Sequence, residues 1–179
     1  MLGPRLVGRN GVILRPPTLE DQRRDLEWQL EPETTRFWGP RFIEITPDTA
    51  LARLRRHAES TDGVGWSIEF EAEHVGFTGI FGIDWRSRDG ESGLFIGRHD
   101  LYGRGIASEA VRLRTGFAWD ELNLHRVHNF IALGNRGSRR ANEKAGYRQI
   151  GLLRDAWYRS GEWHHEWMGE VFPVSEPES

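Results

Sequence analysis

A glycine-rich turn followed by a helical pattern is the part of this sequence best suited to specific chemistry. Gly103 and Gly105 precede Ile106, where apolar residues begin to recur at helical spacing. Two glycines let a ligand approach the backbone closely, and the first turn of a helix presents unpaired N–H groups at the positive end of its dipole. The segment 103–108 therefore predicts a pyrophosphate-binding loop, although most glycine pairs are plain turns.

Two familiar phosphate loops do not fit the segment. A Walker A loop has four residues between its glycines and then lysine, whereas five residues separate Gly97 from Gly103 and no lysine follows. The dinucleotide fingerprint needs glycine or alanine at Ser108 and an acidic residue near the end of the next strand. That strand is expected to end in Leu133-Gly134-Asn135. A nucleotide-dependent oxidoreductase is therefore the weaker enzyme alternative.

Further motifs accompany the loop at fixed distances. The stretch 98–110 resembles motif A of the GNAT superfamily, (Q/R)-x-x-G-x-(G/A). Downstream, Asn135-Arg136-Gly137-Ser138 and Asn142-Glu143-Lys144-Ala145-Gly146-Tyr147 resemble its N-x-x-S…(Y)-E-K-x-G-F signature. The resemblance spans about residues 12–172 and is closest to the branch of ribosomal-protein N-terminal (Rim-type) acetyltransferases. It implies an N-acetyltransferase that moves an acetyl group from acetyl-CoA to a primary amine by direct attack.

The resemblance also implies a fold and a cofactor site. The fold is an α/β GNAT fold with a mixed, mostly antiparallel central sheet flanked by helices. Its parallel strands, here 93–98 and 125–133, splay apart so that the pantetheine arm of CoA pairs with the freed backbone groups. By this matching, the residues expected to contact acetyl-CoA are Ile96, Arg98, Gly103, Arg104, Gly105, Ile106, Ala107, Ser108, Asn135, Asn142 and Lys144.

The catalytic groups follow less directly from the resemblance. The tyrosine that donates a proton to the thiolate in many relatives is matched by Asn142, so Ser138 is the substitute candidate. The alternative is that Ser138 merely caps a helix. Asn135 is expected to orient pantetheine, although it could simply form a turn.

The base is open at this level, because Phe95 holds the position where relatives carry a glutamate. Glu69 is the carboxylate we name first, and a water chain to bulk solvent is an equal alternative. The other candidate bases are Asp84, His164, His165 and Glu166.

Periodicity predicts the elements that must position these groups. Their order is β-α-α-β-β-β-α-β-α-β-β, with one βαβ crossover through the glycine-rich loop. The first helix follows the cap-like Thr18, with Leu26 and Leu30 as its apolar stripe. The expected ranges are strands 12–15, 66–70, 75–84, 93–98, 125–133, 147–155 and 163–172, and helices from 18, from Pro47, over 104–119 and over 138–144.

Three details of packing follow from the same patterns. The second helix should turn Leu51, Leu54 and Ala58 inward and Arg53 outward. Trp66, Ile68 and Phe70 alternate with polar residues as in a half-buried strand. The third expectation is a common face for Val75, Phe77, Phe81 and Ile83.

Composition limits the function classes. The chain has 179 residues, no cysteine and a net charge of −3, which predicts a single domain over 1–172 with a polar tail over 173–179. The charge argues against nucleic-acid and membrane binding. No apolar run reaches the roughly 20 residues of a membrane helix, and we expect a cytoplasmic protein.

Several side-chain groups allow alternative interpretations. The pairs His164-His165 and His125/His128 invite a metal site, but neither pair is completed by cysteine or a carboxylate cluster, so we expect no metal. Arg136, Arg139, Arg140 and Lys144 could meet the 3′-phosphate of CoA or form a solvated face. The aromatic residues that could line an acceptor pocket are Trp28, Phe37, Trp38, Trp157, Tyr158 and Trp163.

The sequence does not identify the partner of the reaction. The acceptor is a small-molecule or peptide amine, and a homodimer is a further expectation from the resemblance. The non-enzyme alternative is a CoA-binding or sensing module that keeps the fold without transfer activity.

Overall fold

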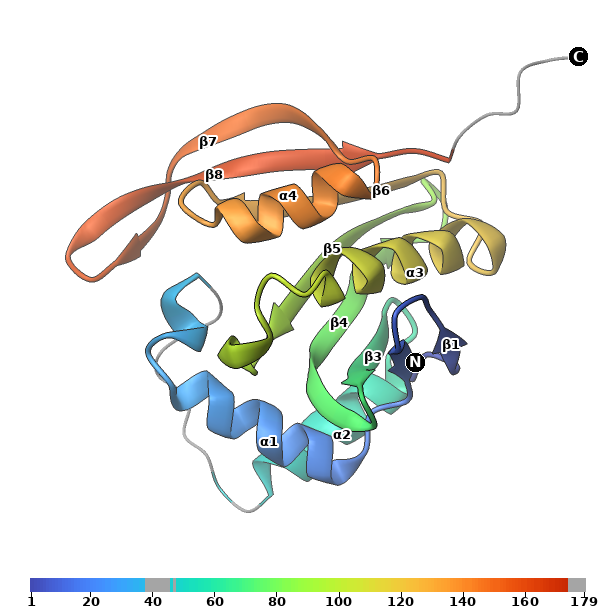
Figure 1. Cartoon of the computed structure of the whole chain (residues 1–179). Helices are drawn as coiled ribbons and strands as arrows, with labels where there is room; N and C mark the ends of the chain where they lie inside the picture. The colour runs from blue at the N-terminus through green and yellow to red at the C-terminus, as the bar shows by residue number, and fades with distance from the viewer. Residues whose placement is uncertain (38–45, 47, 174–179) are drawn as a thin grey trace, which may run out of the picture.

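A computed structural model describes residues 1–37, 46 and 48–173. Figure 1 shows one sheet with α1 and α2 gathered on one side and α3 and α4 on the other. The strands are β1 (Leu6–Val7), β2 (Val12–Arg15), β3 (Val64–Phe70), β4 (Glu73–Asp84), β5 (Asp89–Ile96), β6 (Arg126–Ala132), β7 (Arg148–Arg159) and β8 (Glu162–Val171). The helices are α1 (Leu19–Leu30), η1 (Thr34–Arg36), α2 (Thr49–Glu59), η2 (His99–Leu101), α3 (Ile106–Asp120) and α4 (Arg136–Lys144).

The sheet has the strand order β1-β2-β3-β4-β5-β6-β8-β7. Within the described residues, β5 and β6 form its one parallel pair, and α3 makes the crossover between them. This confirms the predicted α/β class, the mostly antiparallel sheet and the order of elements. The short strand β1 was not predicted, because two residues carry no periodic signal.

The strands β5 and β6 separate after three paired positions. Their parallel register ends at Glu91 opposite His128. Beyond that point β5 continues along β4 as far as Ile96, and β6 continues along β8 as far as Ala132. We call this opening the fork. The fork confirms the predicted splay of the two parallel strands. The strand β5 begins at Asp89, earlier than the predicted range 93–98.

The two faces of the sheet carry separate clusters of buried side chains. On the α1 side, Trp28 packs with Phe77 and Phe95. On the α3 side, Ile106, Ala110 and Val111 belong to the main core together with residues from β2 to β8. Because helices cover both faces, the central strands are buried on both sides.

Three predictions about which side chains are buried were wrong. Ser67 is fully buried rather than solvated, because it donates a hydrogen bond to Asp21 of α1 at 2.9 Å. Leu30 is 59% exposed because it is the last residue of α1, so it does not join Leu26 in a buried apolar stripe. In α2, Ala58 is exposed while Arg53 is half-buried and donates to Gln29 of α1.

The strand β4 does not present one face throughout. Register shifts occur opposite Ile68/Glu69 and again between Phe81 and Asp84. Val75 and Ile83 therefore pack in the main core, while Phe77 and Phe81 pack on the α1 side. A bulge inserts one residue and reverses which face the following side chains occupy.

Capping residues fix the helix ends. Thr18 caps α1, and its hydroxyl accepts from the N–H of Asp21 in a reciprocal capping box, as predicted. Asp48 precedes the first turn of α2. Three predictions fall outside the described residues: Pro47 as the start of that helix, Trp38 as a residue of an acceptor pocket, and tail residues 174–179.

Candidate functional site

The glycine-rich loop has an open backbone at the start of α3. Gly103 and Gly105 adopt φ of +83° and +82°, and a Cβ built at either position meets no atom of the described chain within 4 Å. Gly105 is the N-cap of α3 and offers no side chain to cap it. The first N–H groups of a 15-residue helix are therefore available to an anion that can approach unobstructed.

The other residues of the predicted loop contact the rest of the protein. The buried Ile106 fixes the start of α3 to the core, while Ala107 and Ser108 are half-buried in its first turn. The guanidinium of Arg104 pairs with Glu71 at 2.9 Å and lies over the ring of Phe70. In the free protein, this side chain is thus held away from the loop.

The fork exposes backbone groups along β5. The N–H of Gly97 donates to Val75 of β4, so by strand alternation the N–H and C=O of Leu94 and Ile96 point into the fork. The hydroxyl of Tyr102 donates to the Ile96 carbonyl at 3.1 Å. Arg98 is fixed at the end of this edge by ion pairs to Asp100 and Glu73.

The start of α4 settles the alternative for Ser138. The side chain of Asn135 accepts from the N–H of Ser138 at 3.1 Å and is the N-cap of α4. Ser138 is therefore not the cap, and its half-buried hydroxyl has no hydrogen-bond partner among the described residues. The alternative that Ser138 caps the helix is wrong, because the helix begins at Arg136 and its cap, Asn135, lies one turn before Ser138.

Asn142 and Lys144 occupy opposite environments on the same helix. The Asn142 amide is buried, donates to the carbonyl of Ser138 at 2.9 Å and accepts from Asn129 of β6 at 2.8 Å. Asn142 thus ties α4 to the strand on one side of the fork. Lys144 is exposed in the last turn of α4.

The α1 side of the fork carries two carboxylates. Ser92 is buried against Tyr147 on the α3 side, so its neighbour Glu91 points to the α1 side, as Phe95 does. On β8, Trp167 packs in the main core, so Glu166 points the other way. Burial, and then the charge of Glu91, raise the pKa of Glu166.

Neither carboxylate is neutralised by the protein. No ion pair or hydrogen bond joins Glu91 or Glu166 to another described side chain. By contrast, Glu170 lies four residues after Glu166 on the same face of β8, and it pairs with Arg126 at 3.2 Å. The carboxylate pair therefore leaves uncompensated negative charge beside the fork.

The remaining base candidates are engaged elsewhere. Glu69 pairs with Arg15 at 2.7 Å on β3, which β4 separates from β5. Asp84 accepts hydrogen bonds from Ser87 in an exposed turn. His164 stacks near Trp157, and His165 accepts from the N–H of Asp155 at 2.9 Å. The structure does not bring Glu69 to the fork.

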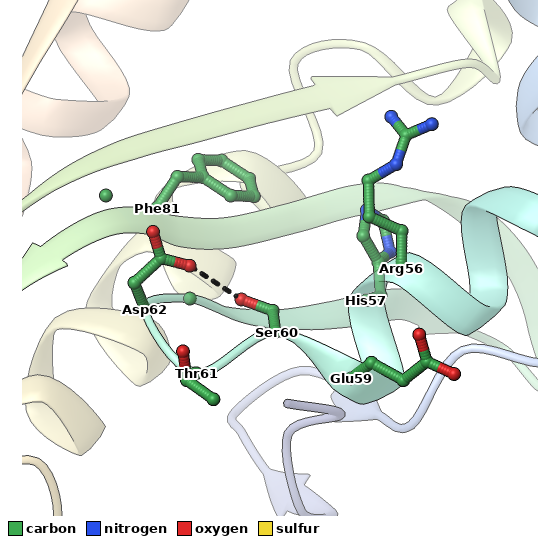
Figure 2. Close-up of a pocket in the computed structure, with 9 residues that line it drawn as sticks. Arg56, His57, Glu59, Ser60, Thr61, Asp62 and Phe81 are labelled. Atoms are coloured by element: carbon green, nitrogen blue, oxygen red, sulfur yellow. Dashed lines mark hydrogen bonds between the residues drawn. The ribbon is translucent and has the colours of Figure 1, made fainter.

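A pocket of about 470 Å³ lies between the end of α2, with the loop that follows it, and Phe81 and Gly82 of β4. Figure 2 shows the side chains that line it. The pocket contains none of the residues expected to hold acetyl-CoA. Burial lowers the pKa of its His57 to about 4, so this side chain is neutral at pH 7. The pocket is lined by Arg56, His57, Glu59, Ser60, Thr61, Asp62, Gly63, Phe81 and Gly82.

Within the described ranges, no three His, Cys, Asp or Glu side chains gather as metal ligands. His128 instead contacts Asp89 at 3.1 Å, and His125 lies edge-on to Phe172. No helix in the same part of the chain is long and apolar enough to span a bilayer.

Sequence reasoning missed two residues of this site. Glu91 lies just before the predicted strand 93–98, and extending the alternation from Phe95 by four residues would have placed it on the same face as Phe95, the α1 side. Arg114 lies on the buried side of α3 and is 1% exposed. Its position on a helix otherwise apolar at that spacing was the available signal.

The chain is similar to known acetyltransferases over most of its length. Residues 12–148 match the family model described as Acetyltransferase (GNAT) domain. A Bacillus subtilis protein named "Putative ribosomal N-acetyltransferase YdaF" is 27% identical over 161 residues, which is 85% of each chain.

Solved structures share the fold. Mycobacterium smegmatis RimJ in complex with CoA-disulfide gives a TM-score of 0.81 at 21% identity, covering 98% of this chain and 89% of the other. Spermidine N-acetyltransferase from Vibrio cholerae, in complex with CoA and spermine, gives 0.82 at 16% identity, covering 90% and 95%.

Proposed function

Because the chain belongs to the GNAT acetyltransferase family, we propose that it acetylates a positively charged primary amine that binds beside Glu166 and Glu91. The protein is an acetyl-CoA-dependent N-acetyltransferase. The observation that carries the proposal is the unpaired carboxylate pair on the α1 side of the fork, because an ammonium group is the partner that such a pair lacks.

The fork and the glycine-rich loop would hold acetyl-CoA. Backbone groups of Leu94 and the N–H of Ile96 would pair with the pantetheine amides, and the start of α3 would receive the pyrophosphate. The open space above Gly103 and Gly105 supports this assignment. Acetyl-CoA supplies the acetyl group, and the chain supplies its orientation.

Glu166 would take the proton that the acceptor must lose. An ammonium group cannot attack a thioester carbonyl until a proton leaves its nitrogen. A carboxylate whose pKa is raised by burial and by a neighbouring Glu91 accepts that proton more readily than an ordinary glutamate. As the new C–N bond forms and the C–S bond breaks, the nitrogen would lose its second proton, and the hydroxyl of Ser138 would relay a proton to the departing sulfur and be reprotonated from that nitrogen.

A protein N-terminus is the acceptor that we favour within this class. Sequence similarity to a relative named as a putative ribosomal N-acetyltransferase extends over 85% of both chains. The similarity to the spermidine enzyme, in contrast, is one of fold. The placement in the Rim-type branch rests on the same relation. A small polyamine is therefore the competing acceptor.

An acceptor panel with thiol release as the readout tests the proposal. We expect turnover of acetyl-CoA with peptides bearing a free N-terminus, and loss of turnover when that terminus is blocked. Glu166→Gln should reduce kcat/KM by about 100-fold or more and remove the acidic limb of its pH profile. Glu170→Gln on the same strand is the matched control and should retain activity. Equal activity in the two variants would refute the role of Glu166.

A second copy of the chain is proposed as the partner of β7. This strand forms the edge of the sheet and exposes Ile150, Leu152 and Leu153. Exposed apolar side chains on an unpaired edge favour association. Light scattering after gel filtration should give twice the mass of the monomer, and a monomeric mass would refute it.

A CoA-sensing module is the competing non-enzyme function. It would bind acetyl-CoA without releasing thiol in the presence of any amine of the panel. Turnover by the wild-type chain with a single acceptor excludes it.

A further inference from the structure

Arg114 is a buried cation that the proposed reaction leaves unused. Its side chain extends from the middle of α3 into the sheet and is 1% exposed. One guanidinium nitrogen donates to the hydroxyl of Thr78 at 2.8 Å and to the carbonyl of Gly93 at 2.9 Å. The other terminal nitrogen donates to the hydroxyl of Tyr147 at 3.4 Å. The guanidinium thus joins β4, β5 and the chain leaving α4.

The contacts continue to the point where the strands separate. The Tyr147 hydroxyl lies 3.1 Å from that of Ser92. The Ser92 hydroxyl in turn donates to the carbonyl of His128 at 3.3 Å. His128 is the last residue of β6 that is in register with β5. The polar network therefore runs from Arg114 to the base of the fork.

The other polar groups of the network have partners without this charge. Among the described carboxylates none pairs with Arg114, and its Nε has no partner. Burying an uncompensated cation is costly. Moreover, Thr78 already donates to Gly93, and Tyr147 already contacts Ser92, so these groups keep partners without the guanidinium. The guanidinium adds contacts to β4, β5 and Tyr147 next to the point where the strands separate.

We propose that Arg114 is a positioning residue for acetyl-CoA, which fixes the separation of β5 from β6 and places a positive charge beneath the fork. The inference rests on the proposed function, in which the pantetheine arm of acetyl-CoA enters the fork. Arg114 acts through Gly93 and Ser92 and does not touch the reacting atoms. Loss of the guanidinium should therefore impair cofactor binding before it impairs the chemistry.

Steady-state kinetics and calorimetry on Arg114→Leu test this inference. We expect the KM and Kd for acetyl-CoA to rise at least tenfold, the KM for the acceptor to stay within twofold, and the melting temperature to be equal or higher. Arg114→Lys keeps the charge and should recover part of the affinity. Arg112→Leu removes an exposed arginine of the same helix that pairs with Glu109, and it should match the wild type.

The outcomes separate this inference from the function on which it rests. Wild-type affinity for acetyl-CoA in a folded Arg114→Leu variant would overturn the role of Arg114 alone. Failure of the wild type to bind acetyl-CoA would overturn the proposed function. If Arg114→Leu does not fold, Tyr147→Phe breaks the link to Ser92 while keeping the cation. We then expect a rise of about threefold in the KM for acetyl-CoA, and an unchanged KM would count against the network.

Discussion

Replacing Gly105 by alanine should separate the backbone strain of the glycine-rich loop from its function. At φ of +82° a non-glycine residue costs about 1–2 kcal/mol. For a chain of this size, that cost lowers the melting temperature by about 2–8 °C. A Cβ at this position meets no protein atom within 4 Å, so the free protein should otherwise be unaffected. A bound pyrophosphate, however, would have to occupy the same space.

Gly161 provides a control with the same strain at a remote site. It has φ of +86° in the turn between β7 and β8, and a Cβ there also meets nothing within 4 Å. We expect both alanine variants to lose similar stability in a thermal melt. In titration calorimetry, only Gly105→Ala should weaken acetyl-CoA binding, by tenfold or more, which corresponds to about 1.4 kcal/mol. Equal affinities in the two variants would show that the loop does not hold the pyrophosphate.

Four further variants test other parts of the structure. Ser138→Ala should lower kcat by about 10- to 100-fold at an unchanged melting temperature, whereas Asn135→Ala should cost about 1 kcal/mol because it removes the cap of α4; the reverse pattern in melts and assays would refute both roles. In the folded protein His57 stays neutral down to a pH of about 4, whereas in the unfolded chain it accepts a proton near its ordinary pKa of 6.5. The free energy of unfolding should therefore decrease as the pH is lowered from 6.5 to 4. His57→Phe should lose less stability between pH 6.5 and 4 in denaturant titrations, and an unchanged slope would contradict the pKa. Thr18→Ala should cost about 1 kcal/mol in the same titrations by removing the capping box of α1, and unchanged stability would discount that cap.

The sequence predicted the order of elements because most of them are long enough for periodicity to identify. The helix over 106–120 and the fork between β5 and β6 were anticipated from the loop and the resemblance. Faces were predicted less well. The bulges in β4 change which side Phe77 and Val75 occupy, and a bulge has no periodic signature. Similarly, Ser67 was placed in solvent because its partner on α1 is distant in sequence.

The residues that we propose as catalytic were harder to predict, because their properties arise from pairs of strands. Glu166 was one of several candidates until its register with β6 placed it beside the fork. Glu91 carried no motif, and its effect on the pKa of Glu166 depends on three strands lying side by side. Ser138 could not be separated from a capping residue until the helix was seen to begin at Arg136.

Alternation along β5 divides the chemistry of the fork between the two faces of the sheet. Ser92 faces α3 and joins the network of Arg114, while Glu91 faces α1 and lies near Glu166. The charge of Arg114 therefore lies on the α3 face, and the two carboxylates lie on the α1 face, where we propose that the amine binds. A shift of β5 by one residue would exchange the two sets of side chains, so under this proposal the register of β5 with β4 fixes the face on which the acceptor binds.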